Sequence, residues 1–404
     1  MKIIVQKFGG TSVATPQARQ AVVHKVKEAL AQGYAPIVVV SAMGRKGDPY
    51  ATDTLIGLLK EENISANSRE MDTMMCCGEI ISSAVMASTL QAAGINAMAL
   101  TGGQAGIFTD SQFGAAKIKK IATEQLLHLA HEAVVPVVCG FQGVTENHGH
   151  FTTLGRGGSD TSAAAIGVAL QAELIEIYTD VEGIMTADPR IVKDANILEE
   201  ISYGEVCQMA QQGAKVIHPR AVEIAMRGNI PMVVKSTFSE APGTLISANC
   251  ALDRGANSIC DRVASGVAHE LNIAQFKVKL DPNDIGAAER LFDKLASHNV
   301  SVGCLNLQPE LTMFAVFSED IQRAQDLLTN EHCDYQLNER CGKVSVVGAG
   351  MGGTPGVMAT FVSALTKQGI PILQTMDSAT TISAIVCENR VVEAVNALHK
   401  AFKL

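Results

Sequence analysis

The stretch 152-TTLGRGGSDTSAAAIGVAL-170 places three glycines and an arginine directly before a run of small apolar residues. The run has the composition of a closely packed helix, so the glycines occupy the turn that leads into it. Free backbone amides at the start of a helix point toward bound negative charge, which makes this turn a candidate anion-binding site. The same residues also suit an ordinary loop in which Ser159 or Asp160 caps the helix. The rest of the chain decides between the two interpretations.

Apolar runs and helical patterns alternate on both sides of this turn. The sequence predicts strands at residues 2–6, 36–42, 95–100, 133–139 and 174–180, and helices at about 17–32, 70–93 and 160–171. Strands and helices that alternate in this way form a mostly parallel sheet with helices on both faces. We therefore expect a three-layer αβα domain over residues 1–245, followed by a linker at 246–263.

The C-terminal part of the chain contains an internal repeat with an offset of 70 residues. Gly286 and Gly356 each open a predicted helix, and the apolar pair Phe276 and Val346 recurs at the same offset. Each unit follows the pattern β-α-β-β-α over about 70 residues, which is typical of ferredoxin-like modules. The sequence therefore predicts two such modules, one over residues 264–340 and the other over residues 341–404.

The run Gly348-x-Gly350-x-x-Gly353 has the spacing of a dinucleotide fingerprint after a predicted strand. Too few residues follow it to build the βαβαβ half that such a site needs. The corresponding turn of the first module also lacks these glycines. We interpret the run as the glycine-rich turn of a small module.

Composition and charge narrow the class of protein. The chain has 404 residues, of which 47% are hydrophobic, and a net charge of -9, which argues against broad binding to nucleic acid or to anionic membranes. The apolar run in the first ten residues is too short for a signal peptide, and we expect no membrane-spanning stretch. Ten cysteines without a C-x-x-C pair indicate reduced, buried thiols in the cytoplasm and no metal site.

Three turns that contain glycine or serine follow the ends of predicted strands in the first domain. They are 7-KFGGTS-12, 41-SAMG-44 and 155-GRGGSD-160. In open α/β sheets, ligands bind at this edge. Lys7 supplies a compact charge suited to phosphoryl oxygens, and Arg156 supplies a planar fork suited to a carboxylate. The motif G-x-x-x-x-G-K-[ST] does not occur. The turns describe a site for a polyphosphate and a carboxylate.

Several motifs are similar to those of the aspartate kinase branch of the amino acid kinase family. They are 5-VQKFGGTSV-13, 38-VVVSAMG-44, 77-CGEIISS-83, 153-TLGRGGSDTSAA-164, 178-YTDVEGIMTADPR-190 and 213-GAKVIHPRA-221. The C-terminal repeat resembles the paired ACT modules of those enzymes, so the resemblance covers essentially the whole chain. The length and the segment 51-ATDTL-55 resemble the single-function, diaminopimelate-sensitive enzymes of Bacillus-like bacteria. The resemblance implies transfer of the γ-phosphoryl group of ATP to the side-chain carboxylate of L-aspartate, which begins the biosynthesis of lysine, diaminopimelate, threonine and methionine.

The resemblance also implies roles for individual residues. The implied catalytic residues are Lys7, Arg156 and Asp160. The implied ATP-binding residues are Lys7, Phe8, Gly9, Gly10, Ser41, Ser159, Tyr178, Thr179, Asp180, Ile184, Asp188, Pro189, Arg190 and Lys215. The implied substrate-binding residues are Thr52, Glu79, Arg156, Gly157, Gly158 and Ser159. Taken singly, Glu79 also suits a solvated helix residue, Asp160 a helix cap and Lys215 a surface lysine. Mg²⁺ would enter with ATP.

ACT modules in this family bind an amino-acid effector and pair with one another, which implies feedback regulation and a homo-oligomer. The implied regulatory residues are Asp281, Ile285, Gly286, Asn306, Pro355 and Gly356. In the first module, 281-DPNDIG-286 displaces the proline of the turn and adds two acids. These acids suit the second ammonium of diaminopimelate or lysine, or they only solvate the loop. The resemblance favours diaminopimelate, with lysine and threonine as alternatives.

Two other functions fit part of the sequence. A kinase that acts on glutamate, N-acetylglutamate or carbamate would share the first domain, but such enzymes usually lack a paired ACT tail. An inactive amino-acid sensor would share the tail, but the charged positions of the motifs are intact in this chain. We therefore expect an aspartate kinase with ATP, L-aspartate and an amino-acid effector as its ligands, and with no nucleic-acid or membrane partner.

Overall fold

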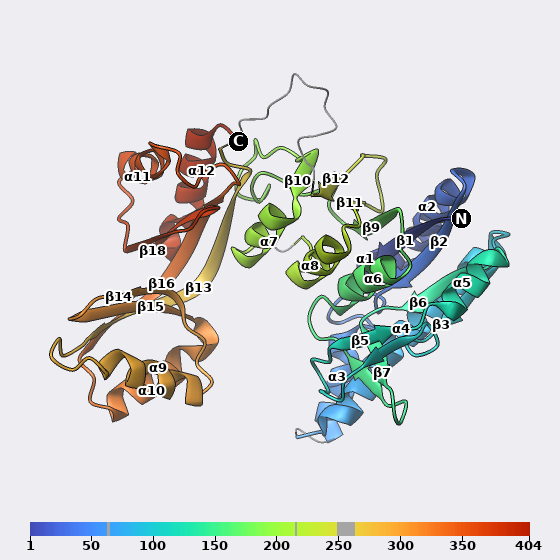
Figure 1. Ribbon diagram of the computed structural model, residues 1–404, viewed down its shortest axis with the longest axis horizontal. Helices are drawn as coiled ribbons and strands as arrows, with labels where there is room; N and C mark the ends of the chain where they lie inside the picture. Colours follow the sequence, from blue (N-terminus) through green and yellow to red (C-terminus); the bar gives the residue numbers. More distant parts are fainter. Residues whose placement is uncertain (63–64, 215, 249–262) are drawn as a thin grey trace. The chain divides into compact units, whose positions relative to one another are not determined.

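The computed structural model describes residues 1–62, 65–214, 216–248 and 263–404, which form two compact units (Figure 1). The first unit contains the described parts of Met1–Ile184, Ile197–Ala210 and Lys215–Cys260. The second unit contains Met185–Asn196, Gln211–Ala214 and the described part of Asp261–Leu404. Two short segments within residues 1–245 therefore belong to the second unit.

The first unit is built on an eight-stranded sheet with the order β10-β12-β11-β9-β1-β2-β6-β3. All neighbouring strands are parallel except β11 and β12. This confirms the mostly parallel sheet that the sequence predicts. The strands are β1 (Lys2–Phe8), β2 (Tyr34–Val40), β3 (Ala97–Leu100), β6 (Val135–Cys139), β9 (Leu174–Thr179), β10 (Glu200–Ser202), β11 (Met232–Ser236) and β12 (Thr244–Ser247).

Helices pack on this sheet. Three of them match the predicted helices: α2 (Pro16–Ala31), α4 (Ser68–Ala92) and α6 (Gly158–Ala169). The others in the described part of this unit are α1 (Gly10–Val13), α3 (Thr52–Glu62), α5 (Glu124–His131), α7 (Tyr203–Gln211) and α8 (Pro219–Gly228). A β-carbon at Gly167 of α6 would lie 2.6 Å from the side chain of Ile175 on β9. The small residues of α6 therefore allow it to pack closely on the sheet, which fixes the position of its first turn.

Helix α4 is long and apolar enough to cross a membrane by length and composition alone, which the sequence analysis did not expect. In the structure it packs against β3, β6 and β8 (Phe151–Thr153). Its Asp72 and Glu79 are both buried, and they are seven residues apart, which places them on one face of the helix. We interpret α4 as a core helix of the first unit.

A second, four-stranded sheet in the first unit has the order β5-β4-β7-β8. It contains β4 (Ile107–Thr109), β5 (Ile118–Ile121), β7 (Gln142–Thr145) and β8. The sequence analysis did not predict these strands, because runs of three or four residues are too short to show an alternating pattern. The sheet matters for the site because β8 leads directly into the glycine loop at residues 155–158.

The second unit contains a six-stranded antiparallel sheet with the order β14-β15-β13-β16-β18-β17. Its strands are β13 (Gly266–Lys279), β14 (Gly303–Leu307), β15 (Leu311–Phe317), β16 (Tyr335–Val347), β17 (Gln374–Asp377) and β18 (Thr381–Cys387). Its helices are α9 (Ala287–Ser297), α10 (Ile321–Asn330), α11 (Val357–Lys367) and α12 (Val391–Phe402). This arrangement confirms two ferredoxin-like modules.

Strands β13 and β16 run through both modules. Residues 273–278 of β13 pair with β15 and with the first half of β16, whereas residues 266–270 pair with residues 343–347 of β16. The N-terminal end of β13 therefore extends the sheet of the second module. The repeated apolar positions lie in the two cores, since Phe276 and Val346 are both buried. Gly348 allows close approach of the backbone at Val263, and Gly353 has a positive φ of 77°, so the G-x-G-x-x-G run forms a turn.

Candidate functional site

Lys7 and Asp160 form a nearly buried ion pair at the carboxyl edge of the parallel sheet. Lys7 is the penultimate residue of β1, and its Nζ lies 2.7 Å from Oδ1 of Asp160 in the first turn of α6. The next residue, Phe8, points to the opposite face of the sheet, where its ring stacks on Tyr178 with the centroids 4.6 Å apart. Strand alternation thus directs the Lys7 ammonium toward the start of α6.

The glycine loop before α6 has a conformation that other residues adopt with difficulty. Gly155 and Gly157 have positive φ values of 76° and 65°. Gly157 is the N-cap of α6, and no side chain caps this helix. The interpretation in which Ser159 or Asp160 caps α6 is therefore wrong, because Asp160 pairs with Lys7 and Ser159 bonds to Ser41. The Gly158 amide donates to the Gly155 carbonyl at 3.0 Å. The next amides of α6, which no side chain caps, suit an anion.

The turns after β1 and β2 meet this loop. The hydroxyl groups of Ser41 and Ser159 lie 2.9 Å apart, and the Ser41 amide donates to the Phe8 carbonyl at 3.2 Å. A β-carbon at Gly10 would lie 2.7 Å from the carbonyl oxygens of Ala42 and Gly44, so a glycine is needed where the two turns touch. The structure therefore brings all three predicted turns together at one edge.

Glu79 reaches the same region from α4. Its side chain is buried, and Oε1 accepts a hydrogen bond from the Ala42 amide at 3.0 Å. Oε2 has no hydrogen-bond partner within the described residues. Burial raises the pKa of Glu79 to about 8, against the effect of the Ala42 hydrogen bond. Glu79 is not a solvated helix residue, and its free oxygen suits a cationic ligand.

Gly78 explains how Glu79 comes this close to the turn after β2. A β-carbon at Gly78 would lie 2.8 Å from the β-carbon of Ala42.

Thr52, at the start of α3, is half-buried, and Arg156 in the glycine loop is exposed. The Arg156 guanidinium is thus accessible to a ligand.

The residues predicted to bind ATP divide between the two units. In the first unit, Gly9 donates its amide to the Tyr178 carbonyl at 3.3 Å, and Thr179 donates its hydroxyl to Asp180 at 3.1 Å. Asp180 also pairs with Arg45 at 2.5 Å, and Ile184 is buried. In the second unit, Asp188 pairs with Arg190 at 2.7 Å and Pro189 lies between them. Lys215 lies outside the described residues.

Sequence reasoning missed three residues that hold the site. Arg220 donates to the Leu154 carbonyl at 2.8 Å and to the Ala116 carbonyl at 3.2 Å, which fixes the end of β8. The His218 ring occupies the space where a β-carbon at Gly157 would lie. Both residues belong to the quoted motif 213-GAKVIHPRA-221, in which only Lys215 was assigned.

The third missed residue is Asp72. Its buried carboxylate accepts hydrogen bonds from the amides of Gly114 and Thr153 and from the Thr153 hydroxyl, all at 2.8–3.0 Å. It ties α4 to β8 and thereby supports the glycine loop. A signal for it exists in the sequence, since an acid two helical turns before Glu79 lies on the same face of an otherwise apolar helix.

In the second unit, the residues predicted to be regulatory lie at the two strand-to-helix turns, except Asn306, which lies on a strand. Asp281 accepts the Asn283 amide at 2.9 Å, Asp284 pairs with Arg290, and Ile285 is 98% exposed. Asp281 also lines a cavity of about 240 Å³ that residues of α9 and α10 share. Gly286 is the N-cap of α9, Asn306 lies on β14, and Pro355 precedes Gly356, whose φ is 90° at the N-cap of α11.

We expect Gly157→Ala to damage the site through both backbone strain and steric overlap. A β-carbon there would lie 2.2 Å from the His218 ring, and the residue has a positive φ. The strain alone is about 1–3 kcal/mol. Gly33→Ala is a matched control, since Gly33 also has a positive φ but no atom within 4 Å of its added β-carbon. Thermal melts and the KM for aspartate should change more for Gly157→Ala, and equal changes in the two variants would contradict this account.

Comparison with known proteins agrees with this geometry. Residues 2–236 match the amino acid kinase family, and residues 336–400 match the ACT domain. The chain is 48% identical to aspartokinase 1 of Bacillus subtilis, with full coverage of both chains, and 38% identical to the aspartokinase of Geobacillus stearothermophilus, of which it covers 98%. The crystal structure of E. coli aspartokinase III with aspartate and ADP superposes with a TM-score of 0.80 at 25% identity and full coverage of both chains.

Three findings point to the same family. They are the mostly parallel sheet with glycine turns at its carboxyl edge, the match to the ACT domain, and the full-length similarity to aspartokinases. The chain therefore belongs to the amino acid kinase family, and within it to the aspartokinases. It is an ATP-dependent kinase that transfers the γ-phosphoryl group to the side-chain carboxylate of L-aspartate, giving 4-phospho-L-aspartate. This reaction begins the biosynthesis of lysine, threonine and methionine.

Proposed function

We propose that the transfer takes place at the edge where Lys7, Ser41, Glu79 and the glycine loop meet. The observation that carries this proposal is the nearly buried ion pair of Lys7 and Asp160 beside the uncapped start of α6. A carboxylate is already an ionised nucleophile, so the reaction needs positioning and charge neutralisation more than a strong base. Lys7 neutralises the transferring phosphoryl group. The Gly10 amide assists it, whereas the Gly9 amide donates to the Tyr178 carbonyl and holds the turn in place.

The two ends of aspartate would be held by opposite charges. Arg156 grips the α-carboxylate with its planar fork, and the free Oε2 of Glu79 receives the ammonium. Ser41, Thr52, Gly157, Gly158 and Ser159 complete this pocket. Asp160 holds Lys7 in place until the phosphates arrive. A substrate without an ammonium would leave Glu79 buried and unpaired, which disfavours N-acetylated acceptors.

The ATP side would include Phe8, Tyr178, Thr179, Asp180 and Ile184 of the first unit. Asp188, Pro189, Arg190 and Lys215 complete the proposed set. Mg²⁺ would be bound mainly by phosphate oxygens and water, since it seldom occupies an all-protein cage. The donor set fits this arrangement, because the carboxylates of Asp160 and Asp180 are already paired with Lys7 and Arg45. The ion would neutralise part of the negative charge of the phosphates.

One cluster elsewhere could be mistaken for a metal site. His24, Glu28 and Glu240 are the one such grouping within the described residues. Lys25 Nζ lies 2.7 Å from Glu240 and 3.4 Å from Glu28, so a cation is already present between the two carboxylates. We do not assign a metal there.

For regulation, we propose that the second unit binds an amino-acid effector at the turn between β13 and α9. Asp281, Ile285 and Gly286 belong to this turn, and Asn306 on β14 would take part as well. Pro355 and Gly356 would contribute from the corresponding turn before α11. Crystals of E. coli aspartokinase III with lysine and aspartate have been described, and that chain superposes with a TM-score of 0.76 at 25% identity. We favour diaminopimelate, then lysine and threonine, with ACT modules pairing in a cytoplasmic homo-oligomer. Inhibition titrations with the three amino acids test the choice, and no inhibition by any of them would reject the effector site.

A direct assay tests the substrate. ATP and L-aspartate are incubated with the enzyme, and hydroxylamine traps the acyl phosphate as a hydroxamate. We expect a hydroxamate with L-aspartate and little with L-glutamate or N-acetyl-L-glutamate, because the position of the ammonium at Glu79 and of the carboxylate at Arg156 fixes the length of the acceptor. Comparable rates with L-glutamate would contradict the proposed pocket.

We expect Arg156→Lys to impair the enzyme although it keeps the charge. A lysine cannot form the two parallel hydrogen bonds of a guanidinium fork, which belong to the stronger class of about 1.5–3 kcal/mol each. The KM for aspartate should rise by at least tenfold, and the KM for ATP should change little. Steady-state kinetics with each substrate varied in turn gives the answer. Equal damage to both KM values would place Arg156 on the phosphates.

The raised pKa of Glu79 predicts that aspartate binding depends on pH. Burial raises its pKa to about 8, so at neutral pH the free enzyme holds this carboxyl largely protonated. Binding of the substrate ammonium favours the ionised form, so a proton leaves when aspartate binds. The KM for aspartate should therefore fall as the pH rises through about 8 and then level off. In Glu79→Gln this trend should disappear and the KM should be raised at every pH. A pH-dependent trend that persists in Glu79→Gln would assign it to another group.

A further inference from the structure

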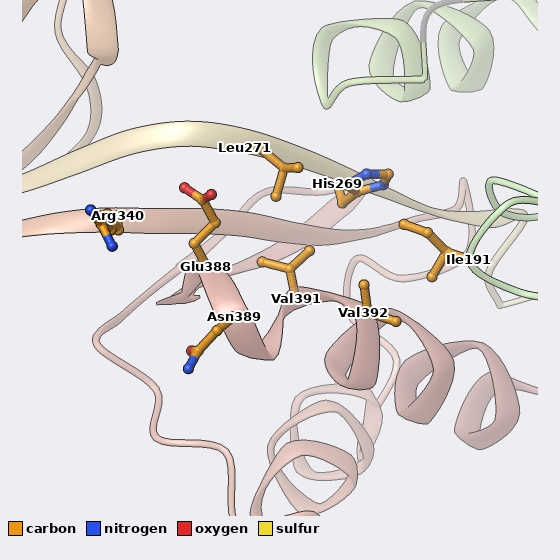
Figure 2. A pocket seen from close by; sticks show the side chains of 8 residues that line it. All are labelled: Ile191, His269, Leu271, Arg340, Glu388, Asn389, Val391 and Val392. Atoms are coloured by element: carbon orange, nitrogen blue, oxygen red, sulfur yellow. The ribbon is translucent and has the colours of Figure 1, made fainter.

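The second unit contains a cavity of about 460 Å³ between the strand pair β13–β16 and the beginning of α12 (Figure 2). Four stretches of chain line it: β13, β16, residues 388–392 at the beginning of α12, and the segment at residues 185–196. The lining residues are Ile191, His269, Leu271, Arg340, Glu388, Asn389, Val391 and Val392. None of them belongs to the turn between β13 and α9, where the effector is proposed above.

The backbone around this cavity is irregular. The pairing of β13 with β16 changes register between Glu270 and Ile273, and Arg340 has a positive φ of 54°. A β-carbon at Gly342 of β16 would lie 2.3 Å from Cγ2 of Val391, so this glycine lets α12 approach the strands. Leu271 and Val392 are 40% and 53% exposed, and they give the cavity an accessible apolar wall.

Two opposite charges line the cavity without an ion-pair partner among the described residues. They are Arg340 and Glu388. Charged residues nearby in the sequence do have ion-pair partners: Lys343 pairs with Glu270 at 2.8 Å, and Arg390 pairs with Glu393 at 2.7 Å. Figure 2 shows Glu388 between Arg340 on one side and the apolar residues Leu271 and Val391 on the other. A cavity with one free cation, one free anion and an aliphatic wall complements a small molecule with those same three features.

We propose that this cavity binds a free α-amino acid with an aliphatic side chain. Arg340 receives the carboxylate, Glu388 receives the ammonium, and Leu271 and Val392 contact the side chain. The volume accommodates a molecule of the size of leucine together with water. The site is separate in sequence and in lining from the proposed effector turn.

The cavity also reaches the segment at residues 185–196. Ile191 lines it, and its carbonyl accepts a hydrogen bond from Asn396 of α12 at 3.3 Å. Thr186 of the same segment is hydrogen-bonded to His399 at 2.9 Å. A ligand that moves the start of α12 would therefore act on this segment. Because the segment carries Asp188 and Arg190, occupancy should change the KM for ATP; this step alone rests on the nucleotide role proposed above.

The test uses the full-length protein and three related probes. L-leucine carries both charges, 4-methylpentanoate lacks the ammonium and 3-methylbutylamine lacks the carboxylate. We expect calorimetry and thermal melts to show saturable binding of L-leucine with a Kd of about 1 mM, and no binding of either analogue. Arg340→Gln and Glu388→Gln should each weaken L-leucine binding at least tenfold, whereas Lys367→Gln on the exposed side of α11 should leave it unchanged.

Three results would overturn the proposal. They are no binding of L-leucine, L-valine or L-methionine up to about 20 mM, binding that survives both charge variants, and binding that is lost in Asp284→Asn at the other turn. The kinetic step has its own readout. An unchanged KM for ATP in the presence of bound L-leucine would reject the link to Asp188 and Arg190, while the binding result would still support the cavity as an amino-acid site.

Discussion

Replacement of Lys7 by alanine is expected to reduce kcat by about 10²–10³ in a protein that still folds. In the proposed site, the ammonium of Lys7 lies where negative charge is redistributed during phosphoryl transfer. Removal of one such group typically costs about 2.7–4 kcal/mol of transition-state stabilisation. The KM values should change less than kcat. Single-turnover measurement of acyl-phosphate formation separates this effect from product release.

Lys25→Ala is a matched control for this variant. Lys25 is also a buried lysine of the first unit with carboxylate partners, Glu28 and Glu240, but it lies on α2 rather than at the carboxyl edge of the sheet. Both substitutions remove a buried lysine together with its ion pair, so both should lower the melting temperature. Only Lys7→Ala should lower kcat severely. Near-normal turnover in Lys7→Ala would show that Lys7 is an ordinary residue at the end of a strand.

The sequence predicted the parts of the fold whose patterns are long. The strands β10, β11 and β12 of the first unit's sheet were not predicted. Helices α4 and α6 and the strands β1, β2, β3, β6 and β9 were found within a few residues, since each spans enough residues to show its pattern. The strands β4, β5, β7 and β8 were missed because three or four residues are too few to show an alternating pattern. Hydrophobic patterns also do not say which core a segment joins, so the membership of residues 185–196 in the second unit could not be read from them.

The candidate site was predicted through motifs, and the limits of that approach are physical. The motifs identified Lys7, Glu79 and the glycine loop because chemistry requires those residue types there. They could not identify Arg220, whose partners are backbone carbonyls at Leu154 and Ala116, because any sequence can supply a carbonyl. The pairing of Asp160 with Lys7, in place of a helix cap, also depends on the close packing of α6 on the sheet.

Truncation after about residue 250 is expected to abolish feedback inhibition and also to destabilise the remaining kinase. The first effect follows because the proposed effector turn is removed, and an effector can shift a conformational equilibrium only if it binds one state better than another. Inhibition titrations with diaminopimelate, lysine and threonine measure this loss. A truncated enzyme that is inhibited as strongly as the full-length protein would reject the regulatory role of the tail.

The second effect of truncation follows from residues 185–196. Ala187 and Val192 are buried in the core of the second module with Phe361 and Leu398, and Ile191 packs against the same cluster. Removal of the tail exposes these side chains, and each large one contributes about 1.5–3 kcal/mol when buried. We expect a lower melting temperature and aggregation, which Ile191→Ser together with Val192→Thr should reduce in the truncated chain. If the truncated chain melts like the full-length protein without these changes, the segment does not depend on the second unit, and a ligand in the cavity beside α12 would have no path through it to the proposed ATP residues.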